Sequence, residues 1–321
     1  MLLHGILEYR HFERLSRWFG QNLEVRKCFA TLSSVQEPIS PTIEHFTPIE
    51  PMEPIRPLKP TPNDPPWKIG AAFGMWVASV LLILLIPALF LAPYAVSIAS
   101  QFPVTDDLIK ALATDPIAIA LQIIAVIPAH LVTILLAWIL ITQGRKYSFT
   151  ETIGWESGGM RWWHYVLTLI AFFALAWLVG SIIPEQETEL TRILKSSRYA
   201  VFLVAFMATF TAPLVEEVVY RGILYSALQR TVGVWLSVAI VTGLFIIVHV
   251  PQYFESAATL ILLSVLSLVL TAVRALTSNL WPCVVLHTLF NGIQAIGLIA
   301  EMYVGPLKKE EVVSAILILA K

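Results

Sequence analysis

Residues 202–228 read FLVAFMATFTAPLVEEVVYRGILYSAL, an apolar run long enough to cross a membrane, with three charged side chains near its centre. These are Glu216, Glu217 and Arg221. Each charge at the centre of a membrane helix costs about 3 kcal/mol on insertion scales. Because membrane helices keep such residues chiefly where function needs them, this run predicts both a spanning helix and the place of the chemistry.

The whole chain has the composition of an integral membrane protein. It is 57% hydrophobic and only 13% charged, whereas soluble domains carry about 25% charge. The net charge of −1, without a basic stripe, argues against nucleic acid as a partner. The two cysteines, Cys28 and Cys283, lie in a polar and an apolar stretch and show no metal-site spacing, so no disulfide is expected.

Apolar runs of about 20 residues predict an all-α, polytopic transmembrane bundle of seven or eight helices. The runs lie at about 70–96, 115–142, 163–183, 199–229, 232–250, 256–273 and 280–300. Five segments follow from them: a polar or amphipathic segment (1–37), a linker (38–66), the first membrane helices (67–162), the helices with the polar groups (163–300) and a tail (301–321). The linker holds ten prolines and is expected to be extended.

Basic residues predict the orientation of the chain. They gather before the first helix and between the second and third helices, and Arg230 and Arg274 fall on the same side if the helices alternate. The positive-inside rule therefore places the N-terminus in the cytoplasm, and the membrane is the plasma membrane if the source is bacterial.

Two further polar groups follow the glutamates at helical spacing. They are FIIVH, which ends at His249, and HTLFN, which carries His287 and Asn291 four residues apart on one helix face. In the first group, Glu217 and Arg221 are also four apart and are expected to pair, which leaves Glu216 free.

The three groups are expected to share one depth in the membrane. At 1.5 Å per residue, Glu216 lies about 20 Å from the turn near residue 230, His249 about 28 Å and His287 about 15–20 Å. A band about 10 Å deep favours one shared site.

The residue types of these groups suit hydrolysis. Glu216 could act as a general base on a water that a histidine holds, either directly or through a metal ion. An amide and an imidazole could donate hydrogen bonds to the oxyanion. A glutamate with two histidines is also a zinc ligand set, here Glu216, His249 and His287, which leaves a divalent metal as an open alternative.

The motifs EEVVYRG, FIIVH and HTLFN resemble the EExxxR, FxxxH and HxxxN motifs of the CPBP intramembrane proteases, also called Abi or CAAX-prenyl-protease-2 (Rce1-like) proteins. The resemblance covers about residues 163–300. It implies a membrane endopeptidase that acts on a peptide or protein substrate at the membrane, prenylated or bacteriocin-like. It also implies that Glu216 and His249 activate the water, that His287 and Asn291 form the oxyanion hole, and that Glu217 and Arg221 support the site.

Other readings of the same residues stay open. The charged group could be a structural ion-pair cluster, and the chain a catalytically silent scaffold or immunity protein. A proton-coupled transporter also needs membrane carboxylates and histidines, but usually shows repeats, and none is visible. His130 and His164 match no motif and are predicted to be structural or interfacial.

Overall fold

The structure is a computed structural model that describes residues 59–102, 104–184 and 186–304. Apart from one isolated bridge between Thr61 and Asp64, these residues contain helices, turns and no strand. The long helices are α3 (Ile69–Ala99), α5 (Pro116–Thr142), α7 (Trp162–Ile182), α12 (Val234–Tyr253), α13 (Ala257–Thr277) and α14 (Trp281–Val304). Between them lie the short helices α4 (Thr105–Thr114), α6 (Phe149–Ile153) and α8 (Glu189–Ser196).

Another long helix, from Arg198 to Val232, is built from five pieces. The pieces are α9 (Arg198–Phe206), η1 (Met207–Thr211), α10 (Ala212–Glu216), η2 (Glu217–Tyr225) and α11 (Ser226–Val232), where η1 and η2 are π-helical. The sequence predicted one spanning helix at about 199–229, which is confirmed, while its two π-helical stretches were not predicted. Pro213 supplies part of the reason, since its ring cannot donate a backbone hydrogen bond and the ladder around it must change.

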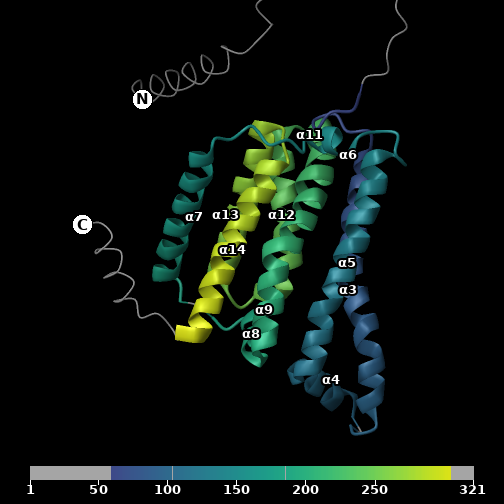
Figure 1. The fold of residues 1–321 in the computed structure, drawn as a ribbon, viewed down its shortest axis with the longest axis vertical. Helices are drawn as coiled ribbons and strands as arrows, with labels where there is room; N and C mark the ends of the chain where they lie inside the picture. The colour runs from purple at the N-terminus through teal and green to yellow at the C-terminus, as the bar shows by residue number, and fades with distance from the viewer. Residues whose placement is uncertain (1–58, 103, 185, 305–321) are drawn as a thin grey trace, which may run out of the picture. The chain divides into compact units, whose positions relative to one another are not determined.

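Seven helices of the described part are long and apolar enough to cross a membrane. They confirm the all-α polytopic bundle, and their bounds differ from the predicted ones by a few residues. Figure 1 shows α3 and α5 side by side, joined at their far end by α4, while α7 lies at the opposite edge beyond α12, α13 and α14. The short helices α4, α6 and α8 were not predicted.

Capping and glycine residues determine where several helices begin and turn. The Asp115 carboxylate accepts hydrogen bonds from the backbone of Ile117 and Ala118, and Pro116 follows it at the first helical position of α5. Gly233 has φ of 82°, a conformation that suits glycine and lets the chain reverse between α11 and α12.

The side chains of η2 are buried inside the bundle, and the outer surface of the bundle is apolar. All nine residues of η2 are buried, and six of them belong to one hydrophobic core cluster. In contrast, large apolar side chains on the outer helices are exposed, for example Leu89 at 69% and Trp177 at 71%. A bundle with a buried polar centre and an apolar outside fits a lipid environment, so the chain is an integral membrane protein.

Residues 59–68, the described end of the proline-rich linker and the start of the next segment, are held against the bundle. The buried Arg274 donates to the Pro62 carbonyl at 2.7 Å, and Arg230 donates to the Asp64 carboxylate at 2.8 Å. The indole of Trp67 donates to the Ile223 carbonyl of η2. This part of the linker is therefore a bound turn and not a free extended strand.

Several predictions concern residues outside the described ranges. They include the amphipathic pattern within 1–37, most of the linker and the tail beyond residue 304. The cytoplasmic N-terminus and the five-segment division stay predictions, although α14 does continue to Val304, into the predicted tail.

Candidate active site

The two glutamates lie where α10 meets η2. Glu216 is the last residue of α10 and Glu217 is the first residue of η2. Just before them, the Ala212 amide donates to the carbonyl of Met207, five residues back, as a π-helix requires. Single turns of π-helix are rare and occur often at functional sites. The local backbone thus presents two adjacent carboxylates on different sides of one helix.

Glu217 is completely buried and paired. Its Oε1 accepts a hydrogen bond from Arg221 Nη1 at 2.9 Å, and both side chains have no exposed area. This ion pair confirms the pairing that the i, i+4 spacing predicted. The other oxygen, Oε2, is buried without a hydrogen-bond partner among the described residues.

The guanidinium of Arg221 also donates hydrogen bonds to the neighbouring helix α13. Its Nη2 donates to the Ser267 hydroxyl at 2.8 Å and to the Ser267 carbonyl at 3.1 Å, and its Nε donates to the Thr271 hydroxyl at 3.2 Å. The guanidinium also lies 5.0 Å from the centre of the Phe245 ring. A buried charge held by this many partners is fixed in place and attaches α13 to η2.

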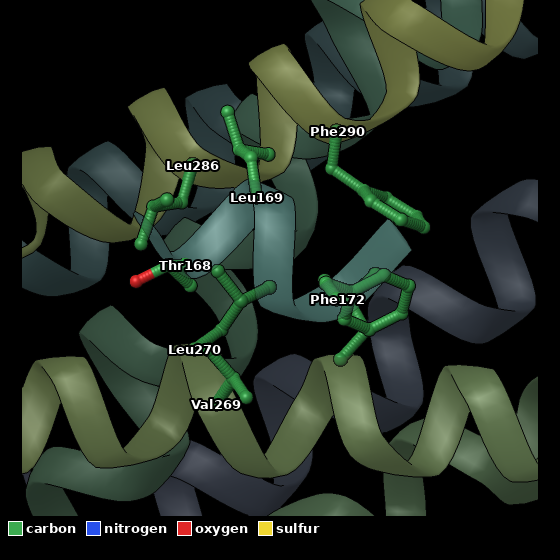
Figure 2. A pocket seen from close by; sticks show the side chains of 8 residues that line it. Thr168, Leu169, Phe172, Val269, Leu270, Leu286 and Phe290 are labelled. Carbon is green, nitrogen blue, oxygen red and sulfur yellow. The ribbon is translucent and has the colours of Figure 1, made fainter. Parts of the chain in front are cut away.

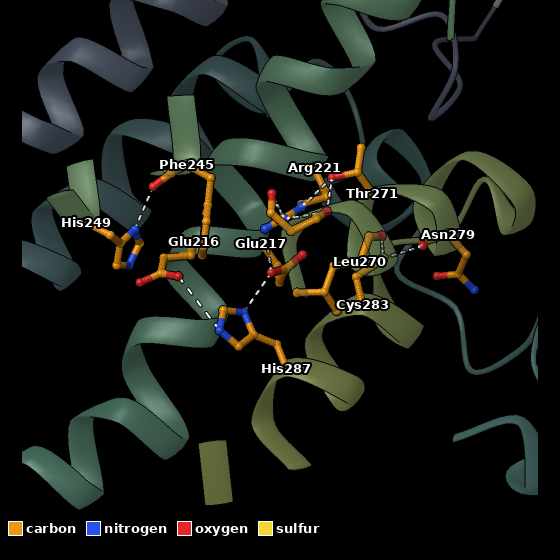
Figure 3. A network of polar contacts seen from close by, with 11 residues as sticks. Glu216, Glu217, Arg221, Phe245, His249, Leu270, Thr271, Asn279, Cys283 and His287 are labelled. Carbon is orange, nitrogen blue, oxygen red and sulfur yellow. Dashed lines mark hydrogen bonds and ion pairs between the residues drawn. The ribbon is translucent and has the colours of Figure 1, made fainter. Parts of the chain in front are cut away.

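The imidazole of His287 lies between the two glutamates (Figure 3). Its Nδ1 is 2.8 Å from Glu217 Oε1, and its Nε2 is 3.9 Å from Glu216 Oε2. Since a carboxylate only accepts, Nδ1 carries a hydrogen and Nε2 is turned toward Glu216. The Glu216 side chain is 24% exposed, which makes it the accessible carboxylate of the pair.

His249 approaches from α12 on the other side of Glu216 in this view (Figure 3). Its Nδ1 donates to the Phe245 carbonyl at 2.6 Å, which leaves Nε2 as the free ring nitrogen. The Phe245 ring lies 4.5 Å from the His249 ring and 6.4 Å from the His287 ring, centre to centre. The Phe245 ring therefore lies near both imidazoles.

Asn291 lies one turn after His287 on α14 and is engaged with the backbone of η1. Its Nδ2 donates to the Ala208 carbonyl at 2.7 Å. One amide hydrogen is therefore used between helices, and the second remains for another acceptor. Its predicted role as an oxyanion donor stays a prediction.

The predicted metal ligands are not gathered as a ligand set. Within the described ranges, no three His, Cys, Asp or Glu side chains are placed to hold a metal ion together. Glu216 Oε2 and His287 Nε2 lie 3.9 Å apart, and the bond of His249 Nδ1 to the Phe245 carbonyl engages the ring nitrogen other than Nε2. Among the residues that the structure describes, the arrangement does not form a metal centre, and a zinc ion stays a prediction.

The sequence missed several contacts of the site. Ser267 and Thr271, which bind Arg221, are ordinary polar residues without a motif, and nothing in the chain singled them out. His130 was predicted to be structural or interfacial, and its contact with the Thr211 hydroxyl of η1, at 3.0 Å, was not predicted. Its visible signal was an imidazole in the middle of an apolar helix.

A hollow between α7, α13 and α14 is lined by apolar side chains and Thr168 (Figure 2). Phe172 and Phe290 meet edge to face in its wall, with ring centres 4.4 Å apart. Because its lining holds no titratable side chain, this hollow supplies no group for hydrolysis.

Comparison with known protein families finds a match that spans all three polar motifs. Residues 198–293 match the family model described as type II CAAX prenyl endopeptidase Rce1-like. The segment 198–293 is Rce1-like. It contains all three motifs, from Glu216 to Asn291, and so confirms the family resemblance. No curated protein sequence and no solved structure matches the chain.

The Rce1-like match supports a CAAX-type intramembrane protease, and it leaves α3, α5 and α7 outside the matched segment. His130 belongs to this unmatched part, on α5.

Proposed function

We propose that the protein is a membrane endopeptidase in which Glu216 activates a water molecule for attack on a peptide carbonyl. The observation that carries this proposal is the pair of acceptors at the centre of the bundle. Glu216 Oε2 and His287 Nε2 lie 3.9 Å apart, and Glu216 is accessible while Glu217 is neutralised by Arg221. A water between the two acceptors can donate one hydrogen to each.

In the proposed reaction, Glu216 takes a proton from the water as its oxygen bonds to the carbonyl carbon. The carbonyl oxygen becomes an oxyanion, and the protonated Glu216 then delivers the proton to the leaving amine as the C–N bond breaks. Atoms and charges balance without another reactant. The free Nε2 of His249 is available to orient the water or the substrate from the other side.

Glu217 has a supporting part in this scheme. Its oxygen accepts the Nδ1 hydrogen of His287 and holds the ring with Nε2 turned toward Glu216, where Nε2 can accept a hydrogen bond from the water. The second amide hydrogen of Asn291 is available to donate to the oxyanion. Removal of one oxyanion donor typically lowers kcat by about 10²–10³.

The proposal predicts that purified protein in lipid bilayers cleaves a prenylated CAAX peptide, which the family description makes the first substrate to try. Glu216→Gln should abolish turnover and leave the melting temperature unchanged, since the side chain keeps its shape. Glu301→Gln, an exposed carboxylate of α14, is the matched control and should behave as the parent does. Near-parental turnover by Glu216→Gln would refute the assignment, and no cleavage of any peptide by the parent would favour the silent scaffold.

A further inference from the structure

His130 is a buried imidazole that the proposed reaction does not use. It lies 14 residues after the start of α5 at Pro116, which is about 21 Å along the helix axis and near the middle of a membrane span. Only 5% of the residue is exposed. An ionisable side chain at this depth is costly without a partner, so its contacts indicate why it is there.

The partner of His130 is Thr211, the last residue of η1. Nδ1 of His130 lies 3.0 Å from the Thr211 hydroxyl oxygen. That hydroxyl also donates to the Met207 carbonyl at 3.4 Å, which leaves its oxygen to accept from the imidazole. Met207 and Thr211 are the first and last residues of η1, so this contact acts on the whole π-helical turn.

A second contact holds η1 from the opposite helix. Asn291 of α14 donates to the Ala208 carbonyl at 2.7 Å. Next to it, a Cβ on Gly292 would lie 3.4 Å from the Thr209 methyl group, so α14 and η1 are closely packed there. Side chains from α5 and α14 thus hold the turn on two sides, and Glu216 follows it by five residues.

We propose that His130 is a positioning residue, which together with Asn291 clamps η1 and thereby sets Glu216 against His287. The catalytic consequence rests on the proposed function, but the clamp itself does not. The clamp also gives α5 a role in the site, although α5 lies outside the Rce1-like segment.

Two measurements on the full chain in lipid nanodiscs test this proposal. The first is deuterium uptake of peptides that cover residues 207–216, which reports opening of η1. The variants are His130→Phe, Thr211→Val, their double variant and Thr211→Ser, which keeps the hydroxyl. Thr133→Val is the matched control, because the Thr133 hydroxyl is buried on α5 and binds only the Ala129 carbonyl of its own helix.

We expect His130→Phe and Thr211→Val each to raise the uptake rate by about fivefold to tenfold, the effect of one lost buried hydrogen bond. The double variant should match the singles, since two residues that act through one contact are not additive. Thr211→Ser and Thr133→Val should match the parent. Unchanged uptake in Thr211→Val, or a double variant whose effect is the product of the singles, would overturn the clamp.

The second measurement is cleavage of the CAAX peptide. In His130→Phe and Thr211→Val we expect kcat to fall by about tenfold with KM unchanged, as for a displaced base. Thr211→Ser, which keeps the hydroxyl, should have the kcat of the parent. An opened η1 with parental kcat would overturn the positioning role. If the parent itself cleaves nothing, the proposed function fails, and deuterium uptake still decides the clamp. If His130→Phe does not fold, Thr211→Val and Thr211→Ser decide both questions.

Discussion

Nδ1 of His287 and Oε1 of Glu217 lie 2.8 Å apart and join the third motif of the chain to the first. The same oxygen accepts from Arg221, so one buried carboxylate serves both as the partner of a structural ion pair and as the anchor of an imidazole. Glu217 therefore connects the packing of η2 with the orientation of α14. Its neighbour Glu216 has neither of these bonds, and it is the base of the proposed reaction.

Loss of Arg221 should destabilise the protein. Arg221→Ala leaves the Glu217 charge buried without its cation, and breaking a buried pair costs about 3–5 kcal/mol. Thermal unfolding in detergent measures the effect. The control is Arg192→Ala, which removes ion pairs at an exposed position and should leave the melting temperature close to that of the parent. An Arg221→Ala protein that melts with the parent but is inactive would instead indicate a direct catalytic role.

His249 and Asn291 should differ in their effect on turnover. His249→Ala removes a free imidazole nitrogen beside Glu216 and is expected to leave no measurable cleavage. Asn291→Ala removes a donor and a contact to η1, and should lower kcat by about 10²–10³ while activity stays detectable. Single-turnover assays on both variants make the comparison. Equal losses would rule out this division of labour.

The zinc prediction can be decided by metal analysis. If Glu216, His249 and His287 converge on zinc, the purified protein should hold about one metal ion per chain. The content should fall in His249→Ala and His287→Ala and stay at the parental level in Asn291→Ala. Activity that survives chelators in a preparation without stoichiometric metal would contradict the zinc prediction and leave the glutamate–histidine mechanism.

Gly154 should tolerate no side chain. Its φ is +70°, and a Cβ there would lie 2.5 Å from the Ser278 carbonyl oxygen, next to the bond from Leu280 to the Gly154 carbonyl. Gly154→Ala is expected to cost about 1–3 kcal/mol and lower the melting temperature. Gly158→Ala is the matched control, because its Cβ would meet nothing within 4 Å. Equal melting temperatures would show that the turn relaxes without cost.

The amino-acid sequence by itself determined the class of the protein and the identity of its polar motifs. Hydropathy is a local property, so runs of apolar residues predicted all seven spans to within a few residues. The pair between Glu217 and Arg221 was also predictable, because both residues lie on one helix and their spacing determines whether they meet.

Tertiary structure decided the contacts between helices. Depth arithmetic placed the three polar groups in a band about 10 Å deep, but a hydrogen bond needs a separation of about 3 Å, which depends on helix rotation and tilt. The link from His287 to Glu217, the Ser267 and Thr271 contacts of Arg221, and the contact between His130 and Thr211 all depend on which helix faces pack together. The π-helical turn η1 also depends on tertiary structure, because side chains of α5 and α14 contact it. No pattern along the chain predicts such contacts.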